Sequence, residues 1–263
     1  MKILMNGKRL KNDINVSLVK GKYNKGLISE NSSLGSEIRI TATREKLIIE
    51  NGDMSTYIRV ENYHMKCETT GRFCVNADTL LKYLPDEECS IVSIDGIIKV
   101  SYGNSIAELP SLERHQYAHV MERFSAICET DHEESDCLKV TEKLTLNTKV
   151  AVHTNALVDS FKTAEKVGTS VYTLGYEGQV LTVSSHRGSQ NFSTRINAIE
   201  GSTTEPSIGS FSLPMVKAIL HGEDEWTYIY YDDDMPFVFV NGGVTILRAH
   251  VDRDWETNQC LAQ

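Results

Sequence analysis

The sequence has 263 residues, of which 40% are hydrophobic and 24% are charged. This composition is that of a globular protein with room for two domains, and it excludes a disordered or collagen-like chain. The formal net charge of −9 argues against a broadly basic protein that binds nucleic acid over its whole surface. The distribution of the charges, and not their sum, decides whether one face can still meet DNA.

The chain carries no apolar run of about 20 residues, so no membrane span is expected. No secretion signal is recognisable at the N-terminus, and the six cysteines are scattered, which favours reduced thiols in an intracellular compartment. One group, Cys128, His132 and Cys137, contains residue types that bind zinc. It lacks a CxxC pair and an obvious fourth ligand, so no metal is expected there.

In the first half, Leu10, Ile14 and Leu18 recur every fourth residue and predict a helix over residues 6–20. Alternating or β-branched runs then predict strands over 37–43, 46–50 and 55–60. A second helix is expected over 77–84, capped by Asn76 or Asp78 and ended by Pro85. Asp95-Gly96 predicts a hairpin between strands 90–94 and 97–102.

Periodicity fades over residues 113–137, which we interpret as a connector with a helical turn over 120–127. A strand is expected over 138–152, followed by a helix that Thr154 or Asn155 caps and that ends at Val167. The remaining predictions are strands over 170–174, 179–184 and 191–196, a helix over 213–221, and strands over 226–231, 237–240 and 244–250.

The order of elements in 71–109 returns in 209–247: a strand, a short helix, an acidic turn and a β-rich run. A repeat of this length indicates two similar domains. We therefore predict an α+β protein with a first domain over 1–112, a connector over 113–137, a second domain over 138–251 and a C-terminal tail over 252–263.

The stretch 38–47 (IRITATREKL) resembles the strand-and-turn element of DNA polymerase sliding clamps of the bacterial β-clamp type. The stretches 73–85, 98–100 and 107–112 resemble the later part of such a clamp domain. The resemblance implies the DNA-clamp fold, in which each domain has antiparallel sheets outside and two helices inside. Rings of this family contain six domains, so a two-domain chain implies a homotrimer, as in proliferating cell nuclear antigen.

The resemblance also implies a function: a processivity factor without chemistry or cofactor of its own, which encircles duplex DNA and is opened by a clamp-loader ATPase. Its partners would include a replicative DNA polymerase. The expected DNA-facing residues lie on the predicted helices and are Lys8, Arg9, Lys11, Lys20, Lys82, Lys162, Lys166 and Lys217. Asp13, Asp78, Asp159 and Glu165 dilute this positive charge, and each lysine alone is equally typical of a solvated helix face.

Clamps of this family bind partner peptides in an apolar pocket near the interdomain connector. The corresponding residues of this chain are Thr43, Arg44, Leu47, Met121, Ile127, Leu247, His250 and Val251. The last segment lacks the Met-Pro pair of bacterial clamps, so the preferred peptide motif can differ.

Other functions have weaker sequence support. His186 and Ser189 could form a base and nucleophile, but a turn explains them as well. The triplet Asp232-Asp233-Asp234 could bind a cation or form an acidic hairpin loop. A protein-binding scaffold or a checkpoint-type subunit of a heteromeric ring is the main alternative. Self-closure requires an edge strand at both ends of the chain's arc, and 101–106 and 170–174 are the predicted edges.

Overall fold

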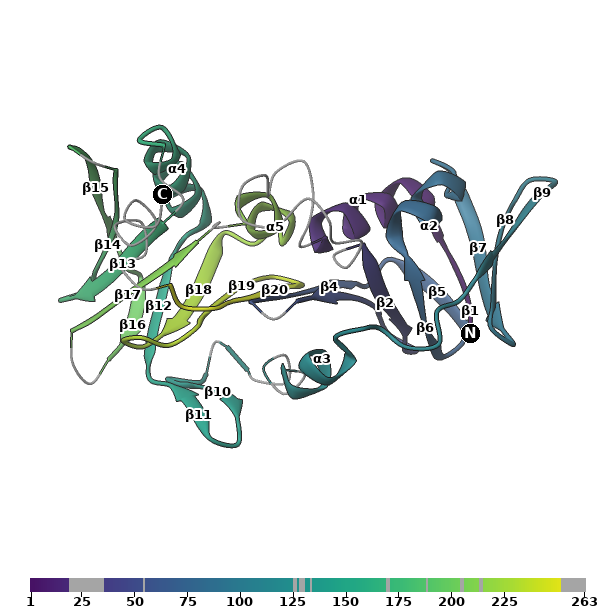
Figure 1. Ribbon diagram of the computed structural model, residues 1–263, viewed down its shortest axis with the longest axis horizontal. Coiled ribbons are helices and arrows are strands. Elements are labelled where there is room, and N and C mark those ends of the chain that lie inside the picture. Colours follow the sequence, from purple (N-terminus) through teal and green to yellow (C-terminus); the bar gives the residue numbers. More distant parts are fainter. Residues whose placement is uncertain are drawn as a thin grey trace, which may run out of the picture. The chain divides into compact units, whose positions relative to one another are not determined.

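The computed structural model describes residues 1–18, 36–53, 55–124, 127, 131–132, 134–168, 171–187, 189–203, 206–212 and 215–251. The chain divides into two compact units, unit 1 (Met1–Glu122) and unit 2 (Arg123–Gln263). Each unit contains antiparallel sheets and two helices, and the short helix α3 (Ala118–Phe124) crosses the boundary (Figure 1). The predicted α+β class with two similar domains is confirmed.

Unit 1 has two sheets, one of five strands in the order β5-β1-β7-β8-β9 and a run of four in the order β4-β3-β2-β6. Its helices are α1 (Gly7–Ser17) and α2 (Ala77–Tyr83). Its strands are β1 (Lys2–Asn6), β2 (Glu37–Ala42), β3 (Leu47–Gly52), β4 (Thr56–Asn62), β5 (Met65–Thr69), β6 (Gly71–Asn76), β7 (Glu88–Ile94), β8 (Ile97–Tyr102) and β9 (Ser105–Pro110).

Unit 2 has a run of five strands in the order β16-β12-β18-β19-β20 and a sheet of four in the order β15-β14-β13-β17. Its helices are α4 (Thr154–Glu165) and α5 (Val216–His221), which pack side by side (Figure 1). Its strands are β10 (Leu138–Thr141), β11 (Leu144–Leu146), β12 (Thr148–His153), β13 (Val171–Glu177), β14 (Val180–Arg187), β15 (Gln190–Asn197), β16 (Glu200–Ser202), β17 (Ser207–Ser212), β18 (Trp226–Tyr231), β19 (Phe237–Asn241) and β20 (Val244–Arg248).

The two units repeat one plan element by element. The order β1-α1-β2 through β6-α2-β7-β8-β9 returns as β12-α4-β13 through β17-α5-β18-β19-β20, and both sheets have corresponding strand orders. Even the helix starts agree, because Gly7 N donates to Glu87 O and Thr154 N donates to Glu225 O, both at 2.8 Å. The repeat noticed over 71–109 and 209–247 is therefore the second half of each unit, and the β10–β11 hairpin lies outside the repeated plan.

Local signals explain the element boundaries in unit 1. The Asn6 side chain accepts from Arg9 N at 3.0 Å and Asn76 accepts from Thr79 N at 3.0 Å, so each asparagine caps a helix. Asp95 and Gly96 have φ values of 50° and 77°, as the predicted tight hairpin requires. Glycine is needed at position 7, because a Cβ there would lie 2.3 Å from Pro85 O.

Three predicted boundaries in unit 2 are wrong. The strand expected over 138–152 is a hairpin, β10–β11, followed by β12. The N-cap of α4 is His153, whose side chain makes no capping hydrogen bond. Thr154 does not cap the helix, because its hydroxyl donates to Asp224 O at 2.9 Å. Helix α5 begins at Val216, not at residue 213. The tail over 252–263 lies outside the described residues.

Each unit buries its own core. In unit 1 the aliphatic side chains of α1, Leu10 and Ile14, lie against the sheet and are fully buried. Unit 2 has an aromatic core in which Phe161 of α4 makes edge contacts with Tyr172 and Phe211, with ring centroids 5.7 and 5.8 Å apart. These contacts fix the helices on the sheets, and the polar helix faces are left for solvent or ligand.

Candidate DNA-facing and partner-binding surfaces

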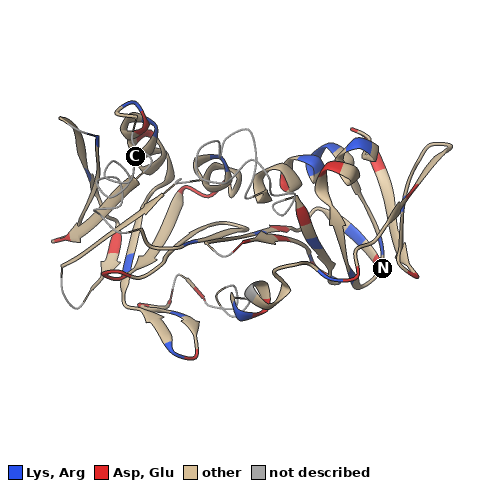
Figure 2. Cartoon of the chain, in the orientation of Figure 1, with Lys and Arg blue, Asp and Glu red and all other residues tan. Residues whose placement is uncertain are grey.

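Helices α1 and α2 carry the positive charge of unit 1. Lys8 and Arg9 on α1 and Lys82 on α2 are exposed, and blue residues gather on these two helices (Figure 2). Lys11 is half-buried and pairs with Asp86 at 2.5 Å, so its charge is partly neutralised. The Lys11 ammonium and the hydrogen bond it donates hold the pKa of Asp86 below its ordinary value.

The sequence argument counted Asp13 as diluting this positive face, and that is wrong. Asp13 is 2% exposed and accepts a hydrogen bond from the Asn62 side chain of β4, so it faces the sheet. All exposed charged residues of α1 are therefore basic. An exposed cationic helix face of this kind can attract phosphate groups through their charge alone.

Unit 2 is different, because its helices carry charges of both signs. Lys162, Lys166 and Lys217 are exposed as expected, but Lys162 lies 3.9 Å from Asp159 and Glu165 is exposed on the same helix. Lys20, the remaining predicted DNA-facing residue, lies outside the described residues. The basic face is thus concentrated on unit 1.

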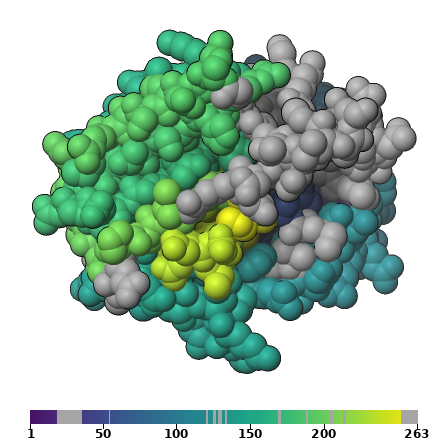
Figure 3. All heavy atoms as spheres, turned by 60° about the vertical axis from the view of Figure 1, so that its left-hand side comes forward, coloured from purple at the N-terminus to yellow at the C-terminus, as the bar shows by residue number. Residues whose placement is uncertain are grey.

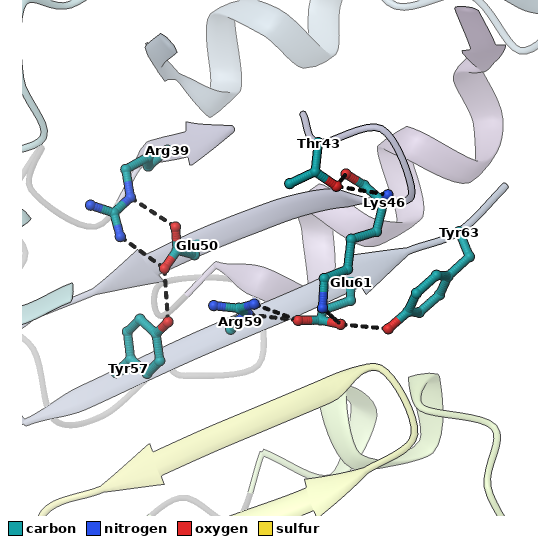
Figure 4. A network of polar contacts seen from close by, with 8 residues as sticks. All are labelled: Arg39, Thr43, Lys46, Glu50, Tyr57, Arg59, Glu61 and Tyr63. Atoms are coloured by element: carbon teal, nitrogen blue, oxygen red, sulfur yellow. Dashed lines mark hydrogen bonds and ion pairs between the residues drawn. The ribbon is translucent and has the colours of Figure 1, made fainter. Parts of the chain in front are cut away.

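The first three pocket candidates lie together at the β2–β3 turn of unit 1. The Thr43 hydroxyl accepts from Lys46 N and donates to Lys46 O, both at 3.0 Å, and so closes the turn (Figure 4). Arg44 is exposed at its tip and Leu47 is fully buried. Thr43 and Leu47 thus stabilise the turn, and Arg44 is the member of this group available to a partner.

The connector candidates Met121, on α3, and Ile127 are both fully buried. The last three candidates lie together at the end of β20 in unit 2. Leu247 is 4% exposed, whereas His250 and Val251 are half-buried beside β17. His250 forms a β-bridge with Phe211, and Val251 N donates to Ser210 O at 2.9 Å. Figure 3 shows the yellow end of the described chain against the green residues that precede it.

A buried polar network on β2, β3 and β4 was not predicted. Arg39 makes two hydrogen bonds of 2.8 Å to Glu50, which also accepts from the Tyr57 hydroxyl at 2.8 Å (Figure 4). All three residues are at most 5% exposed. Burial alone would lower the pKa of Arg39, but the hydrogen bonds and the charge of Glu50 raise it above its ordinary value, so the guanidinium stays charged.

A second, more exposed network continues along β4. Glu61 accepts from Arg59, from Lys46 at 2.7 Å and from the Tyr63 hydroxyl at 2.7 Å (Figure 4). The hydrogen bond to Glu61 raises the pKa of Tyr63 to about 12. The charged groups of β4 are thus paired with neighbours inside unit 1, and their arrangement is that of a structural network.

The zinc hypothesis gains no support. The His132 ring packs against Tyr230 with centroids 5.5 Å apart, and burial lowers its pKa to about 4. Cys137 is exposed, and Cys128 lies outside the described residues. Within the described ranges, no group of three or more His, Cys, Asp or Glu residues could hold a metal ion.

The acidic triplet is used to organise unit 2. The Asp232 carboxylate accepts from Asn147 N at 2.9 Å, from the Asn147 amide at 3.1 Å, and from Thr148 N at 3.1 Å and its hydroxyl at 3.2 Å. Asp233 accepts from Ile208 N at 2.7 Å. The triplet therefore fits the hairpin-loop interpretation.

We predict that Asp232→Ala lowers the stability of unit 2 by about 1–3 kcal/mol, because it leaves the start of β12 without its acceptor. Thermal unfolding with and without millimolar Ca²⁺ or Mg²⁺ measures this. Asp234→Ala is the matched control, because the contact of the Asp234 carboxylate is to His250 Nε2, at 3.6 Å, and not to β12. A large rise of the unfolding temperature with cation, abolished by Asp232→Ala, would contradict the structural role.

The positions of the remaining sequence candidates, the His186–Ser189 pair and the two predicted edge strands, decide between their interpretations. His186 and Ser189 are exposed at the β14–β15 hairpin end, as the turn interpretation expects. The predicted edge at 170–174 is wrong, because β13 pairs with β14 on one side and β17 on the other. In the described part of the chain, β15 pairs only with β14 and β9 pairs only with β8, so these two are edge strands. The other predicted edge, 101–106, covers the end of β8, the turn and the start of the edge strand β9.

No helix in the described ranges is long and apolar enough to cross a membrane.

No family profile matches the sequence, and no curated protein is significantly similar to it. Similarity is found instead among solved structures. A Helicobacter pylori β clamp bound to a DNA ligase peptide matches with a TM-score of 0.70 and 19% identity, over 96% of this chain and 67% of that one.

Two further structures give the same result. A putative DNA polymerase III β subunit from Eubacterium rectale matches with a TM-score of 0.73 and 14% identity, over 97% of this chain and 66% of that one. PCNA of A. fulgidus, bound to the C-terminal region of FEN-1, matches with a TM-score of 0.63 and 13% identity. That match covers 96% of this chain and 98% of the PCNA chain.

Proposed function

We propose that this chain, which has the fold of the DNA sliding clamps, is a clamp that closes into a homotrimeric ring around duplex DNA. The observation that supports this most is the two-unit length. The chain spans about two thirds of the bacterial clamp chains but nearly all of an archaeal PCNA chain. Because rings of this fold contain six domains, three two-unit chains complete one.

Ring closure would join β9 of one copy to β15 of the next. Within the described part of the chain, each of these antiparallel strands pairs with a neighbour on one side only, and such edge strands pair readily with another chain. Ile106 on β9 is 69% exposed, an apolar side chain that an adjoining copy would bury. Because the two edges differ, the contact is head-to-tail, and such contacts form a ring when the rotation closes.

The DNA-facing surface would be the helix layer, with Lys8, Arg9 and Lys82 of unit 1 as its strongest part and Lys162, Lys166 and Lys217 of unit 2 as weaker contributors. A ring holds DNA by topology, so the phosphate contacts can stay weak enough to allow sliding. This reconciles an acidic protein with a DNA substrate.

Each unit offers its own candidate contacts for partner peptides. Arg44 is the exposed candidate of unit 1, and the half-buried His250 and Val251, which follow the buried Leu247, are the candidates of unit 2. The H. pylori structure carries a DNA ligase peptide, and the A. fulgidus structure carries the C-terminal region of FEN-1. By analogy, proteins of these two kinds are proposed as partners of this chain, together with the replicative DNA polymerase that the sequence resemblance implies. A clamp-loader ATPase would open the ring, inside the compartment where replication takes place.

The function is tested by the topology of the DNA. The protein can be loaded onto DNA by its own loader, or by letting the ring open reversibly at low protein concentration. Once loaded, it should stay on closed circular DNA during gel filtration. It should leave when one restriction cut makes the DNA linear. Equal retention on both DNA forms, or on neither, would contradict encirclement.

Charge reversal on α1 tests the DNA-facing surface. We expect Lys8→Glu with Arg9→Glu to weaken binding to short duplex DNA at low salt by about tenfold or more, and to reduce the slope of log affinity against log salt by about two. Fluorescence anisotropy at several salt concentrations measures both. Lys66→Glu with Lys139→Glu is the matched control, because both lysines are exposed on strands. Equal loss in the control would mean that only total charge matters.

A further inference from the structure

Residues 111–121 lead from β9 into α3 and are called the connector start below. This segment lies against β6 and β2 of unit 1. Leu112 N donates to Cys74 O at 2.8 Å, and the Ser111 hydroxyl donates to the same carbonyl at 3.2 Å. Cys74 and Leu112 form an isolated β-bridge. The connector start is therefore held on the edge strand β6 by a β-bridge and hydrogen bonds to Cys74 O.

His115 is the central residue of the connector start. Its side chain is 1% exposed, and both ring nitrogens are used. Nε2 lies 2.8 Å from Glu37 O, which can only accept, and Nδ1 accepts from Tyr117 N at 3.0 Å. These two partners require the neutral ring with its proton on Nε2.

The same residue also contacts the start of helix α3. Ala118 N donates to His115 O at 3.0 Å, and Met121 N donates to Tyr117 O at 3.1 Å. Ala118 and Met121 are both buried, so the first turn of α3 is packed where His115 places it. Tyr117 N is one of the amides that a helix start leaves without an intrahelical acceptor, and here a histidine ring supplies the acceptor.

A second proton on His115 cannot be accommodated in this arrangement. It would place an N–H on Nδ1 directly against the N–H of Tyr117, and two donors repel. The groups that face the ring are Glu37 and Arg39 from β2, Glu50 from β3 and Cys74 from β6, with Tyr117 from the connector itself. Glu50 is bound to Arg39, and the Glu37 carboxylate accepts from Gln116 N at 3.2 Å. The attraction of a cationic ring to Glu37 is smaller than the cost of burying the charge of that ring. Burial lowers the pKa of His115, in agreement with this geometry.

We infer that neutral His115 is a latch that holds the connector start and α3 on unit 1, and that protonation of its Nδ1 releases this segment while the sheets stay paired. The device goes beyond DNA encirclement and does not depend on it, because His115 and its hydrogen-bond partners all lie in unit 1. It would couple the order of the connector to mildly acidic pH.

The sign of the effect follows from proton linkage. A released histidine has a pKa of about 6.5, whereas the latched ring has a lower one, so the released state binds more protons. The latch is complete above pH 6.5 and weakens as the pH falls below that value. One proton is taken up, so the opening equilibrium should rise by at most tenfold for each pH unit between 6.5 and the lower pKa of the latched ring.

Hydrogen exchange of the full chain, followed by mass spectrometry between pH 5 and 7.5 and corrected for intrinsic exchange, tests the latch. Peptides that cover 111–124 should progressively lose protection below pH 6.5, by at most tenfold per pH unit, and peptides from β7 and β8 should not. His115→Asn keeps an acceptor for Tyr117 N and does not titrate, so its pH dependence should vanish. His115→Gln, which keeps a donor for Glu37 O, is a second non-titrating variant if the first folds poorly.

His119→Asn is the matched control, because His119 is exposed on the same helix. It should keep the wild-type pH dependence. An unchanged pH dependence in the two His115 variants, or parallel loss of protection in β7 and β8 of the wild type, would overturn the proposal.

Discussion

Replacing Ile106 with aspartate is expected to dissociate the proposed trimer into monomers. Ile106 is 69% exposed on the edge strand β9, and the neighbouring copy would bury it on closure. Loss of an aliphatic burial of about 1.5–3 kcal/mol, with a carboxylate to be desolvated in addition, should raise the dissociation constant of each interface about 100-fold or more. Sedimentation velocity at micromolar concentration measures the shift.

Ile94→Asp is the matched control for this variant. Ile94 is 56% exposed, but it lies at the end of β7, which is an interior strand paired with β1 and β8. It should leave the oligomer intact. Dissociation by Ile94→Asp to the same extent, or an oligomer that Ile106→Asp leaves unchanged, would exclude β9 as the closure edge.

Replacing Glu50 with alanine is expected to produce the largest loss of stability in unit 1. The change removes two hydrogen bonds to Arg39 and one to Tyr57, and leaves a guanidinium that is 5% exposed without its counter-charge. Breaking a buried ion pair in this way costs about 3–5 kcal/mol. The unfolding midpoint of unit 1 should fall by about 10–20 °C in differential scanning calorimetry.

The double variant Arg39→Met with Glu50→Leu separates the charge effect from packing. An apolar pair of similar volume leaves no unpaired charge, so most of the lost stability should return. If the double variant is less stable than Glu50→Ala alone, the contribution of the network is packing and hydrogen bonding to Tyr57, and the argument from an unpaired charge fails.

Signals of short range made much of the fold predictable. Asn6 and Asn76 cap α1 and α2 as their side chains indicate, and Asp95-Gly96 forms the expected hairpin. The stripe of Leu10 and Ile14 correctly predicted the buried face of α1. Each of these signals lies within a few residues of the structure that it determines.

Features that depend on distant partners were not predictable in the same way. The edge strands follow from tertiary pairing, and so β13 was mistaken for an edge although it is paired on both sides. The turn of the β10–β11 hairpin, at Glu142 and Lys143, contains no Gly, Pro, Asn or Asp, and nothing in its residues marks the break. Strand β1 precedes the first predicted helix and was missed.

The candidate surfaces show the same division. Exposure of Lys8, Arg9 and Lys82 follows from helical periodicity, whereas the inward position of Asp13 depends on Asn62, which lies 49 residues away. Alternation along β2 and β3 assigns Arg39 and Glu50 to a solvated face. Their burial as a pair could not be read from either strand alone, although opposite charges at directly paired positions were the available signal.

Molar mass in solution tests the central claim most directly. Light scattering after size exclusion, over a range of concentrations and salt strengths, should give one species of about 88 kDa, three times the 29.5 kDa of the chain. That mass is what a closed ring of three two-unit chains requires. A persistent 29.5 kDa monomer at high concentration would contradict self-closure and favour a heteromeric ring subunit or a clamp-like scaffold.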